Sequence, residues 1–339
     1  MLAAALPLLL ALISPADRRI AYVGRFDMRD PAAPACQWSA SEVRLRVKGK
    51  EVRATVEEKG HDGWQVVIDG KPASVLTPKE GTDTYTIDLG VDAVHEVRLV
   101  KRTEAFIGTT TFHGFEVPDG RLLPASKSKR RIEFVGDSIT CGFGNEGPNQ
   151  NEHFKPETEN AFMSYASIAA RAVDADVTIL AWSGRKMWPN NTVPEIYDRI
   201  LPTQEEPVFD FKAPAPQAVV INLATNDFGG ENPEETGWTS AYEAFIRRVW
   251  DHYPKALIYV AIGSMMSDNY PPGHMALSTL RGYLSRMVER INDPRLHLIE
   301  FDVQKIEEDG VGADWHPNIR THEKMAARLT EALKKDLKW

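Results

Sequence analysis

Polar and apolar residues alternate in short segments through the first third of the chain, as they do in strands that bury one face. Five segments show this pattern: 42–47, 52–56, 64–68, 85–89 and 96–101. Glycine-containing sequences that favour turns separate them at 48–50, 60–63 and 69–71. The first part of the chain, 18–123, is therefore predicted to form an all-β sandwich.

The pattern changes after a basic, serine-containing stretch at 124–130, which is interpreted as a solvated linker. Apolar, β-branched segments then alternate with stretches of helical periodicity. The predicted strands are 132–135, 177–181, 218–223, 256–262 and 296–301, and the predicted helices are 161–172, 241–253, 276–291 and 321–337. This order predicts a three-layer α/β domain over 131–339, with a parallel sheet and its chemistry at the carboxyl ends of the strands.

The N-terminus begins with an uninterrupted apolar run, 2–13, followed by Ser14-Pro15-Ala16. The run is too short to span a bilayer. It has the length of a signal-peptide core, and Ser14 and Ala16 suit a cleavage site, although basic residues before the core are missing. We therefore predict a signal peptide at 1–17, a secreted or periplasmic protein, and no membrane anchor after its removal.

Net charge and cysteine usage narrow the class of protein. The net charge of −8 argues against a nucleic-acid partner. Two cysteines, Cys36 and Cys141, provide neither a disulfide framework nor a zinc-binding spacing. Cys141 is interpreted as a small buried residue. The composition gives no information on the oligomeric state.

Four short motifs follow predicted strands or precede the last helix, where an α/β sheet carries its chemistry. Ser138 lies in Gly-Asp-Ser after the first strand, Gly184 in Trp-Ser-Gly after the second, and Asn226 after the third. His316 lies in Asp-Trp-His-Pro before the last helix. Each has an ordinary structural alternative, namely helix capping for Ser138, a turn for Gly184 and Asn226, and a surface residue for His316.

Taken together, the four motifs resemble those of the SGNH-hydrolase superfamily. The resemblance implies a flavodoxin-like catalytic domain, with Ser138 as nucleophile and His316 as base. Gly184, Asn226 and the N–H of Ser138 would form the oxyanion hole. Neither a metal nor an organic cofactor is required by this mechanism. Asp137 and Asp227 are interpreted as turn-shaping residues.

One position departs from the superfamily pattern, which is Asp-x-x-His. Ala313 stands where the acid would be, and Asp314 is two residues before His316. This spacing resembles carbohydrate esterase family two, in which some members orient the histidine with a backbone carbonyl. Asp314 is therefore the predicted third catalytic residue, with a backbone carbonyl as the alternative.

Segments of the β-rich part are similar to the same family, which carries a jelly-roll domain before its hydrolase domain. These segments are 23–27, 37–41 and 95–104. The resemblance implies removal of O-acetyl groups from a polysaccharide such as acetylated xylan or glucomannan. Trp315, Trp188 and Trp238 are candidate sugar platforms, each equally suited to packing.

Other functions remain open from the sequence. On the same fold, the substrate could be a lipid, a thioester or the acetyl groups of bacterial cell-wall sugars. In a different class, the protein could be a carbohydrate-binding module with an inactive hydrolase domain.

Overall fold

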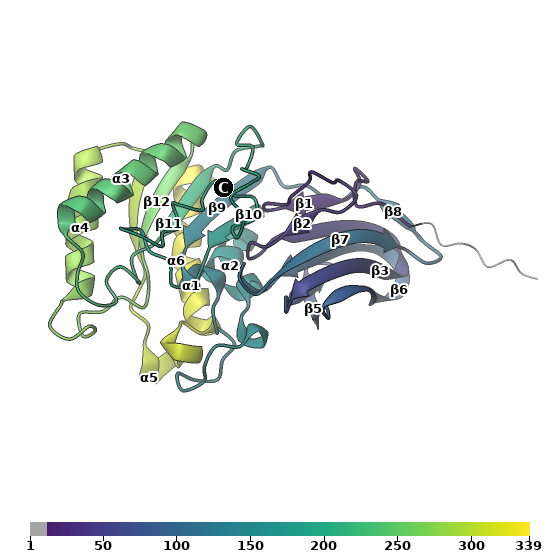
Figure 1. The fold of residues 1–339 in the computed structure, drawn as a ribbon, viewed down its shortest axis with the longest axis horizontal. Coiled ribbons are helices and arrows are strands. Elements are labelled where there is room, and N and C mark those ends of the chain that lie inside the picture. The colour runs from purple at the N-terminus through teal and green to yellow at the C-terminus, as the bar shows by residue number, and fades with distance from the viewer. Residues whose placement is uncertain (1–11) are drawn as a thin grey trace, which may run out of the picture.

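An antiparallel sheet and a parallel sheet follow one another along residues 12–339, the part of the chain that this computed structural model describes (Figure 1). The predicted signal-peptide core falls largely on residues 1–11, which lie outside the described residues. Ile13 is already part of the β-domain, because its N–H donates to the carbonyl of Phe115 at 2.7 Å. None of the helices within 12–339 combines the length and hydrophobicity that a bilayer crossing requires.

The β-domain is built around two long antiparallel strands, β3 and β6. Its strands are β1 (Ala21–Val23), β2 (Ala35–Cys36), β3 (Glu42–Gly60), β4 (Trp64–Ile68), β5 (Lys71–Leu76), β6 (Gly81–Lys101), β7 (Gly108–Glu116) and β8 (Arg121–Leu123). They are arranged β2-β7-β3-β6-β4-β5, and β1 and β8 also pair with β3. The predicted all-β domain is confirmed as an antiparallel, sheet-rich domain, whereas the sandwich arrangement and the jelly-roll topology stay predictions.

The turn predicted at 48–50 is wrong, because this segment continues β3. The register of β3 against β6 shifts between Gly49 and Glu51, so the residues form an irregularity within the strand. A Cβ on Gly49 would lie 3.0 Å from Val117, so glycine permits this close packing. The turns predicted at 60–63 and 69–71 do connect β3 to β4 and β4 to β5.

The second domain has a five-stranded parallel sheet in the order β10-β9-β11-β12-β13. Its strands are β9 (Arg130–Gly136), β10 (Ala175–Ala181), β11 (Ala218–Asn222), β12 (Leu257–Ile262) and β13 (Leu296–Glu300). This order is the flavodoxin-like one. Every residue of β11 is buried, as its continuous apolar sequence predicts.

Helices cover both faces of the parallel sheet (Figure 1). The helices are α1 (Ser138–Cys141), α2 (Tyr165–Ala172), α3 (Glu235–His252), α4 (Ala276–Ile291), α5 (Ile306–Asp309) and α6 (Ile319–Leu337), with short 3₁₀ turns η1 (Pro156–Thr158), η2 (Ala161–Met163) and η3 (Ala313–Trp315). The buried faces of α3 and α4 share one hydrophobic cluster, and those of α2 and α6 share another. The predicted three-layer architecture is therefore confirmed.

The two domains share hydrophobic packing. Ala40, Val67 and Val100 of the β-domain belong to the same buried cluster as helices α2 and α6. Trp38 belongs to the cluster on the opposite face of the parallel sheet, and its Nε1 donates to the carbonyl of Arg199 at 3.3 Å. The β-domain is thus packed directly against the parallel-sheet domain. Both cysteines are buried and unpaired.

Candidate active site

Ser138 is the first residue of α1, and only Asp137 separates it from the end of β9. Gly136 is required at this turn, because a Cβ there would lie 2.0 Å from Thr140 Oγ1. The Asp137 carboxylate caps α1 by accepting the N–H of Ile139 at 3.1 Å. The alternative in which Ser138 merely caps the helix is therefore wrong. The N–H of Ser138 has no acceptor among the described residues.

The His316 side chain bridges Ser138 and a backbone carbonyl. Its Nε2 lies 2.9 Å from Ser138 Oγ, and its Nδ1 lies 3.1 Å from the carbonyl oxygen of Asp314. Since a carbonyl can only accept, Nδ1 carries the proton and Nε2 is free to accept the serine hydroxyl. Burial lowers the pKa of His316 below its usual value, although the bond to the carbonyl opposes this shift.

The Asp314 carboxylate does not contact His316, contrary to the expected side-chain triad. Its Oδ1 lies 2.9 Å from Nδ1 of His153, and its Oδ2 accepts the N–H of Phe154 at 2.9 Å. Burial acts to raise the pKa of Asp314, but these two hydrogen bonds lower it overall. Asp314 and Trp315 both have positive φ, 48° and 66°, and this turn directs the carbonyl rather than the carboxylate of Asp314 toward the imidazole.

The loop that carries His316 is attached to the segment that follows α1. The N–H of Ala313 donates to Gly144 at 2.9 Å, and the N–H of Asp314 donates to Glu152 at 3.0 Å. The completely buried Ala313 methyl packs against Gly144 and Gly147, so position 313 has little space for an aspartate. This packing explains why the usual acid is missing there.

Gly184 and Asn226 follow the strands on either side of β9, so both meet Ser138 at one edge of the sheet. Gly184 is exposed at φ 77°, and within residues 12–339 its N–H has no acceptor. The side chain of Asn226 donates one hydrogen to the carbonyl of Arg185 at 2.9 Å, which leaves its second amide hydrogen available. The N–H groups of Ser138 and Gly184 and one amide hydrogen of Asn226 thus have no acceptor among the described residues, and all three follow strands at the same edge of the sheet.

Asp227 stabilises the loop that contains Gly184. Its buried carboxylate accepts the N–H groups of Met187 and Trp188, each at 3.0 Å, and Nε1 of Trp238 at 2.8 Å. Burial raises the pKa of Asp227, and these hydrogen bonds partly offset the shift. Trp238 is completely buried in the core, so its predicted role as a sugar platform is wrong. Its indole N–H donates a hydrogen bond to the Asp227 carboxylate instead.

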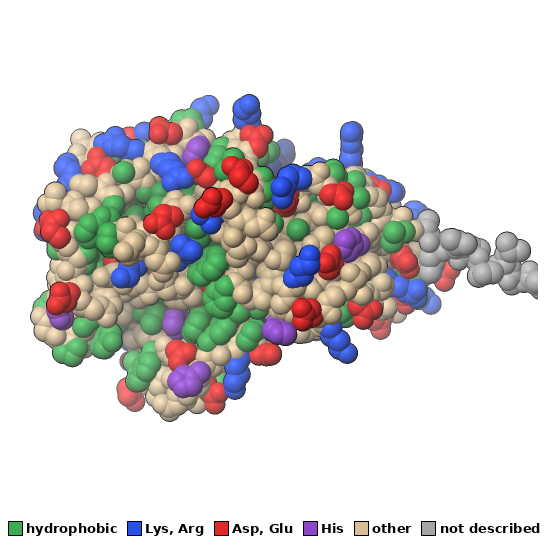
Figure 2. All heavy atoms as spheres, in the orientation of Figure 1, with side chains coloured by type: hydrophobic (Ala, Val, Ile, Leu, Met, Phe, Trp, Pro, Cys, Tyr) green, Lys and Arg blue, Asp and Glu red, His purple; other side chains and the backbone are tan. Residues whose placement is uncertain are grey.

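The other candidate tryptophans differ in accessibility. Trp315 is 51% exposed beside His316, whereas Trp188 is half-buried against the core. Phe143 was not identified from the sequence, although its ring lies 4.3 Å from both His316 and Phe154. An isolated phenylalanine outside a periodic segment gives no signal that could have placed it there. Figure 2 shows hydrophobic side chains gathered in the middle of one face, between the two domains.

Comparison with family models supports both halves of the fold. Residues 22–125 match the Carbohydrate esterase 2 N-terminal domain. Residues 134–324 match the GDSL-like Lipase/Acylhydrolase family. The sheet order, the serine after β9 and the matching region define the second domain as a GDSL-like acylhydrolase domain.

Individual relatives indicate which family within this class the chain resembles. Cellulase/esterase CelE from Acetivibrio thermocellus is 38% identical over 331 residues, which are 94% of this chain but 40% of that protein. An acetylxylan esterase / glucomannan deacetylase from Cellvibrio japonicus is 25% identical over 96% of this chain and 91% of its own length. The structure of a family two carbohydrate esterase from Clostridium thermocellum, in complex with cellohexaose, has a TM-score of 0.89 at 37% identity, covering 94% of this chain and 99% of that chain. The chain thus belongs to carbohydrate esterase family two.

Proposed function

We propose that the protein is a serine esterase that removes O-acetyl groups from a polysaccharide through an acyl-enzyme. The observation that carries this proposal is the hydrogen bond between Ser138 Oγ and His316 Nε2, beside three available N–H donors. A nucleophile, a base in the accepting tautomer and an oxyanion hole are the parts that acyl transfer needs.

The geometry supports a two-step mechanism. His316 accepts the proton from Ser138 as Oγ attacks the acetyl carbonyl, and the resulting imidazolium is stabilised by the carbonyl of Asp314. The tetrahedral oxyanion is held by N–H groups of Ser138 and Gly184 and by the amide of Asn226. His316 then protonates the departing sugar hydroxyl, and water releases acetate from Ser138 by the reverse sequence.

Acetylated xylan or glucomannan is the proposed substrate. The Cellvibrio japonicus relative is named for both polymers, and the Clostridium thermocellum structure contains a sugar oligomer. The exposed indole of Trp315 beside His316 could stack on a sugar ring next to the ester. The predicted signal peptide supports secretion or export to the periplasm, and N-terminal sequencing of the mature protein from a host that exports it tests this point.

The test is acetate release from acetylated xylan, acetylated glucomannan and 4-nitrophenyl acetate. We expect Ser138→Ala to lose at least about 10⁴-fold in kcat while keeping its circular dichroism spectrum and Tm. Unchanged turnover by this variant would contradict the assignment of the nucleophile.

Three rival functions predict different results. A lipid or thioester hydrolase turns over long fatty-acyl esters much faster than acetyl sugars, and a cell-wall deacetylase prefers acetylated peptidoglycan to xylan. A binding module with an inactive hydrolase domain binds xylan or cello-oligosaccharides and releases no acetate. Any of these outcomes would overturn the proposed reaction or substrate.

A further inference from the structure

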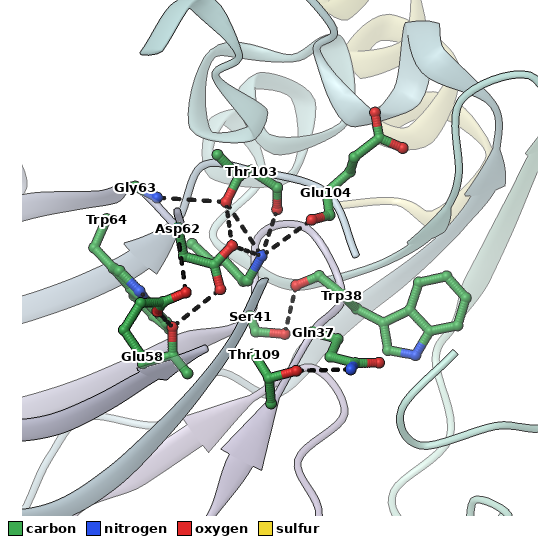
Figure 3. A network of polar contacts seen from close by, with 12 residues as sticks. Gln37, Trp38, Ser41, Glu58, Asp62, Gly63, Trp64, Thr103, Glu104 and Thr109 are labelled. Carbon is green, nitrogen blue, oxygen red and sulfur yellow. Dashed lines mark hydrogen bonds and ion pairs between the residues drawn. The ribbon is translucent and has the colours of Figure 1, made fainter. Parts of the chain in front are cut away.

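A carboxylate from the β-domain reaches the loop that carries the proposed oxyanion donor. Glu104 follows β6, and its side chain is completely buried. Its Oε2 accepts the N–H of Ser183 at 2.7 Å, and its Oε1 accepts the hydroxyl of Ser183 at 2.5 Å. Ser183 directly precedes Gly184. In Figure 3 the carboxyl group of Glu104 points away from the polar network of the β-domain and toward the other domain.

A buried ammonium group fixes the backbone on the β-domain side. Lys101 Nζ donates to Asp62 Oδ1 at 2.6 Å, and to the carbonyls of Thr103 at 2.9 Å and Glu104 at 3.3 Å. Asp62 also accepts the hydroxyl of Thr103 at 2.7 Å (Figure 3). Lys101 and Asp62 are both completely inaccessible to solvent. Because buried and fully paired polar groups hold one geometry, Glu104 projects from a rigid support.

A second buried carboxyl group, that of Glu159, contacts the backbone of Glu104. Glu159 Oε2 accepts the N–H of Glu104 at 2.9 Å, and the Sγ of Cys141 lies 3.7 Å from Glu104 Oε2. Burial raises the pKa of both carboxyl groups, that of Glu159 far above its usual value. Both Glu104 oxygens accept hydrogen bonds from Ser183, whereas Glu159 accepts one from the backbone of Glu104.

These three side chains also have the spacing of a metal site, with their ligand atoms within 4.8 Å of one another. The contacts favour a positioning role, since the Glu104 oxygens already accept two donors from Ser183.

From these contacts we infer that Glu104 is a positioning residue for the oxyanion hole, an inference that rests on the proposed esterase function. The peptide between Ser183 and Gly184 carries the proposed donor, and Glu104 fixes it by two bonds on its N-terminal side. Asp227 fixes the C-terminal side of the same loop through Met187 and Trp188. The β-domain thus supplies one of the two supports of the catalytic geometry in the neighbouring domain.

The test compares Glu104→Ala with Glu104→Gln and with the control Glu58→Gln, using 4-nitrophenyl acetate and acetylated xylan. Displacement of one oxyanion donor lowers transition-state binding alone, so Glu104→Ala is expected to lose about 10- to 100-fold in kcat with KM within about 2-fold. Glutamine keeps an acceptor for the N–H of Ser183 and should recover most of the activity. Glu58 is a buried glutamate of the same domain that accepts Thr110 Oγ1 at 2.7 Å and, among the described residues, makes no hydrogen bond to Lys101 or Glu104, so Glu58→Gln should lower Tm and leave kcat unchanged.

Hydrogen exchange of the segment 182–188 provides a readout without substrate. Faster exchange in Glu104→Ala than in Glu58→Gln is expected. Wild-type kcat in Glu104→Ala, or equal losses of kcat in Glu104→Ala and Glu58→Gln, would overturn the inference. If the wild-type protein releases no acetate but segment 182–188 still exchanges faster in Glu104→Ala than in Glu58→Gln, the proposed function fails, while the contact of Glu104 with the Ser183 loop is confirmed.

If Glu104→Ala does not fold, Ser183→Ala takes its place. This variant removes the hydrogen bond that the Ser183 hydroxyl donates to Glu104, keeps the one from the Ser183 N–H, and should lower kcat severalfold. An unchanged kcat in Ser183→Ala would then overturn the inference.

Discussion

The two loops that complete the candidate active site are supported in different ways. Backbone groups orient the His316 side chain and its loop: the Asp314 carbonyl accepts from the imidazole, and the N–H groups of Ala313 and Asp314 donate hydrogen bonds to the carbonyls of Gly144 and Glu152. Carboxylates hold the loop of Gly184, Glu104 on one side and Asp227 on the other. The Asp314 carboxylate also anchors the His316 loop, through the N–H of Phe154, but no carboxylate contacts the imidazole itself among the described residues. Two carboxylates, in contrast, bind the loop of the proposed oxyanion donor Gly184. This difference predicts where substitutions should be severe and where they should be mild.

The largest expected effect is that of His316→Ala. The variant removes the only group within hydrogen-bond distance of Ser138 Oγ among the described residues. We expect kcat for 4-nitrophenyl acetate to fall by about 10⁴-fold or more, with Tm little changed. A loss below 10-fold would show that another group acts as the base, and the His316 loop would then not be the support of the base.

The second largest loss of activity is expected for Asn226→Ala. It removes one oxyanion donor and the bond to the Arg185 carbonyl, so kcat should fall by about 10²–10³-fold. Steady-state kinetics should place the loss in kcat rather than KM, since the oxyanion forms only after Oγ attacks the ester and is absent from the bound substrate. A loss confined to KM would instead assign Asn226 to substrate binding.

Asp314→Asn tests the backbone-supported loop and should have a much smaller effect, below about 10-fold. Loss of a side-chain acid from a triad costs about 10⁴-fold, but here the carbonyl of residue 314 remains. Asparagine tolerates positive φ and can still accept the N–H of Phe154. A loss comparable to that of His316→Ala would indicate that the carboxylate of Asp314, and not its carbonyl, orients His316.

The pH dependence of kcat/KM tests how the environment of His316 sets its pKa. His316 must be neutral to accept a proton, and burial lowers its pKa. The acidic limb of kcat/KM should therefore have its midpoint below the usual histidine value of about 6.5. The negative charge of Asp314 favours the imidazolium, so Asp314→Asn should move the midpoint slightly lower still. A midpoint that rises in the variant would contradict this sign.

The smallest effect is expected for Trp315→Ala. Loss of an exposed stacking surface should raise KM for acetylated xylan by about 3- to 10-fold and leave 4-nitrophenyl acetate hydrolysis unchanged. The small ester is the internal control. Equal effects on both substrates would indicate that Trp315 supports the His316 loop rather than the sugar.

Periodicity and motif order predicted the parallel sheet and the residues at its carboxyl edge, because strand ends and short loops are local features of the sequence. Asp314 was harder to place, since its role depends on two consecutive residues with positive φ. Trp238 of α3 could not be distinguished from a surface tryptophan, because its burial depends on how α3 packs on the sheet and on the preceding loop that carries Asp227. Glu104 lies 79 positions from Ser183, and only the packing of one domain on the other brings them together.

The hydrophobic cluster that Ala40, Val67 and Val100 share with α2 and α6 has a consequence for modularity. Two domains with a common core cannot easily be separated, because cutting between them would expose apolar surface on both sides. The pair should therefore melt in a single calorimetric transition and be inherited as one indivisible unit, rather than as a portable catalytic module with an exchangeable accessory domain.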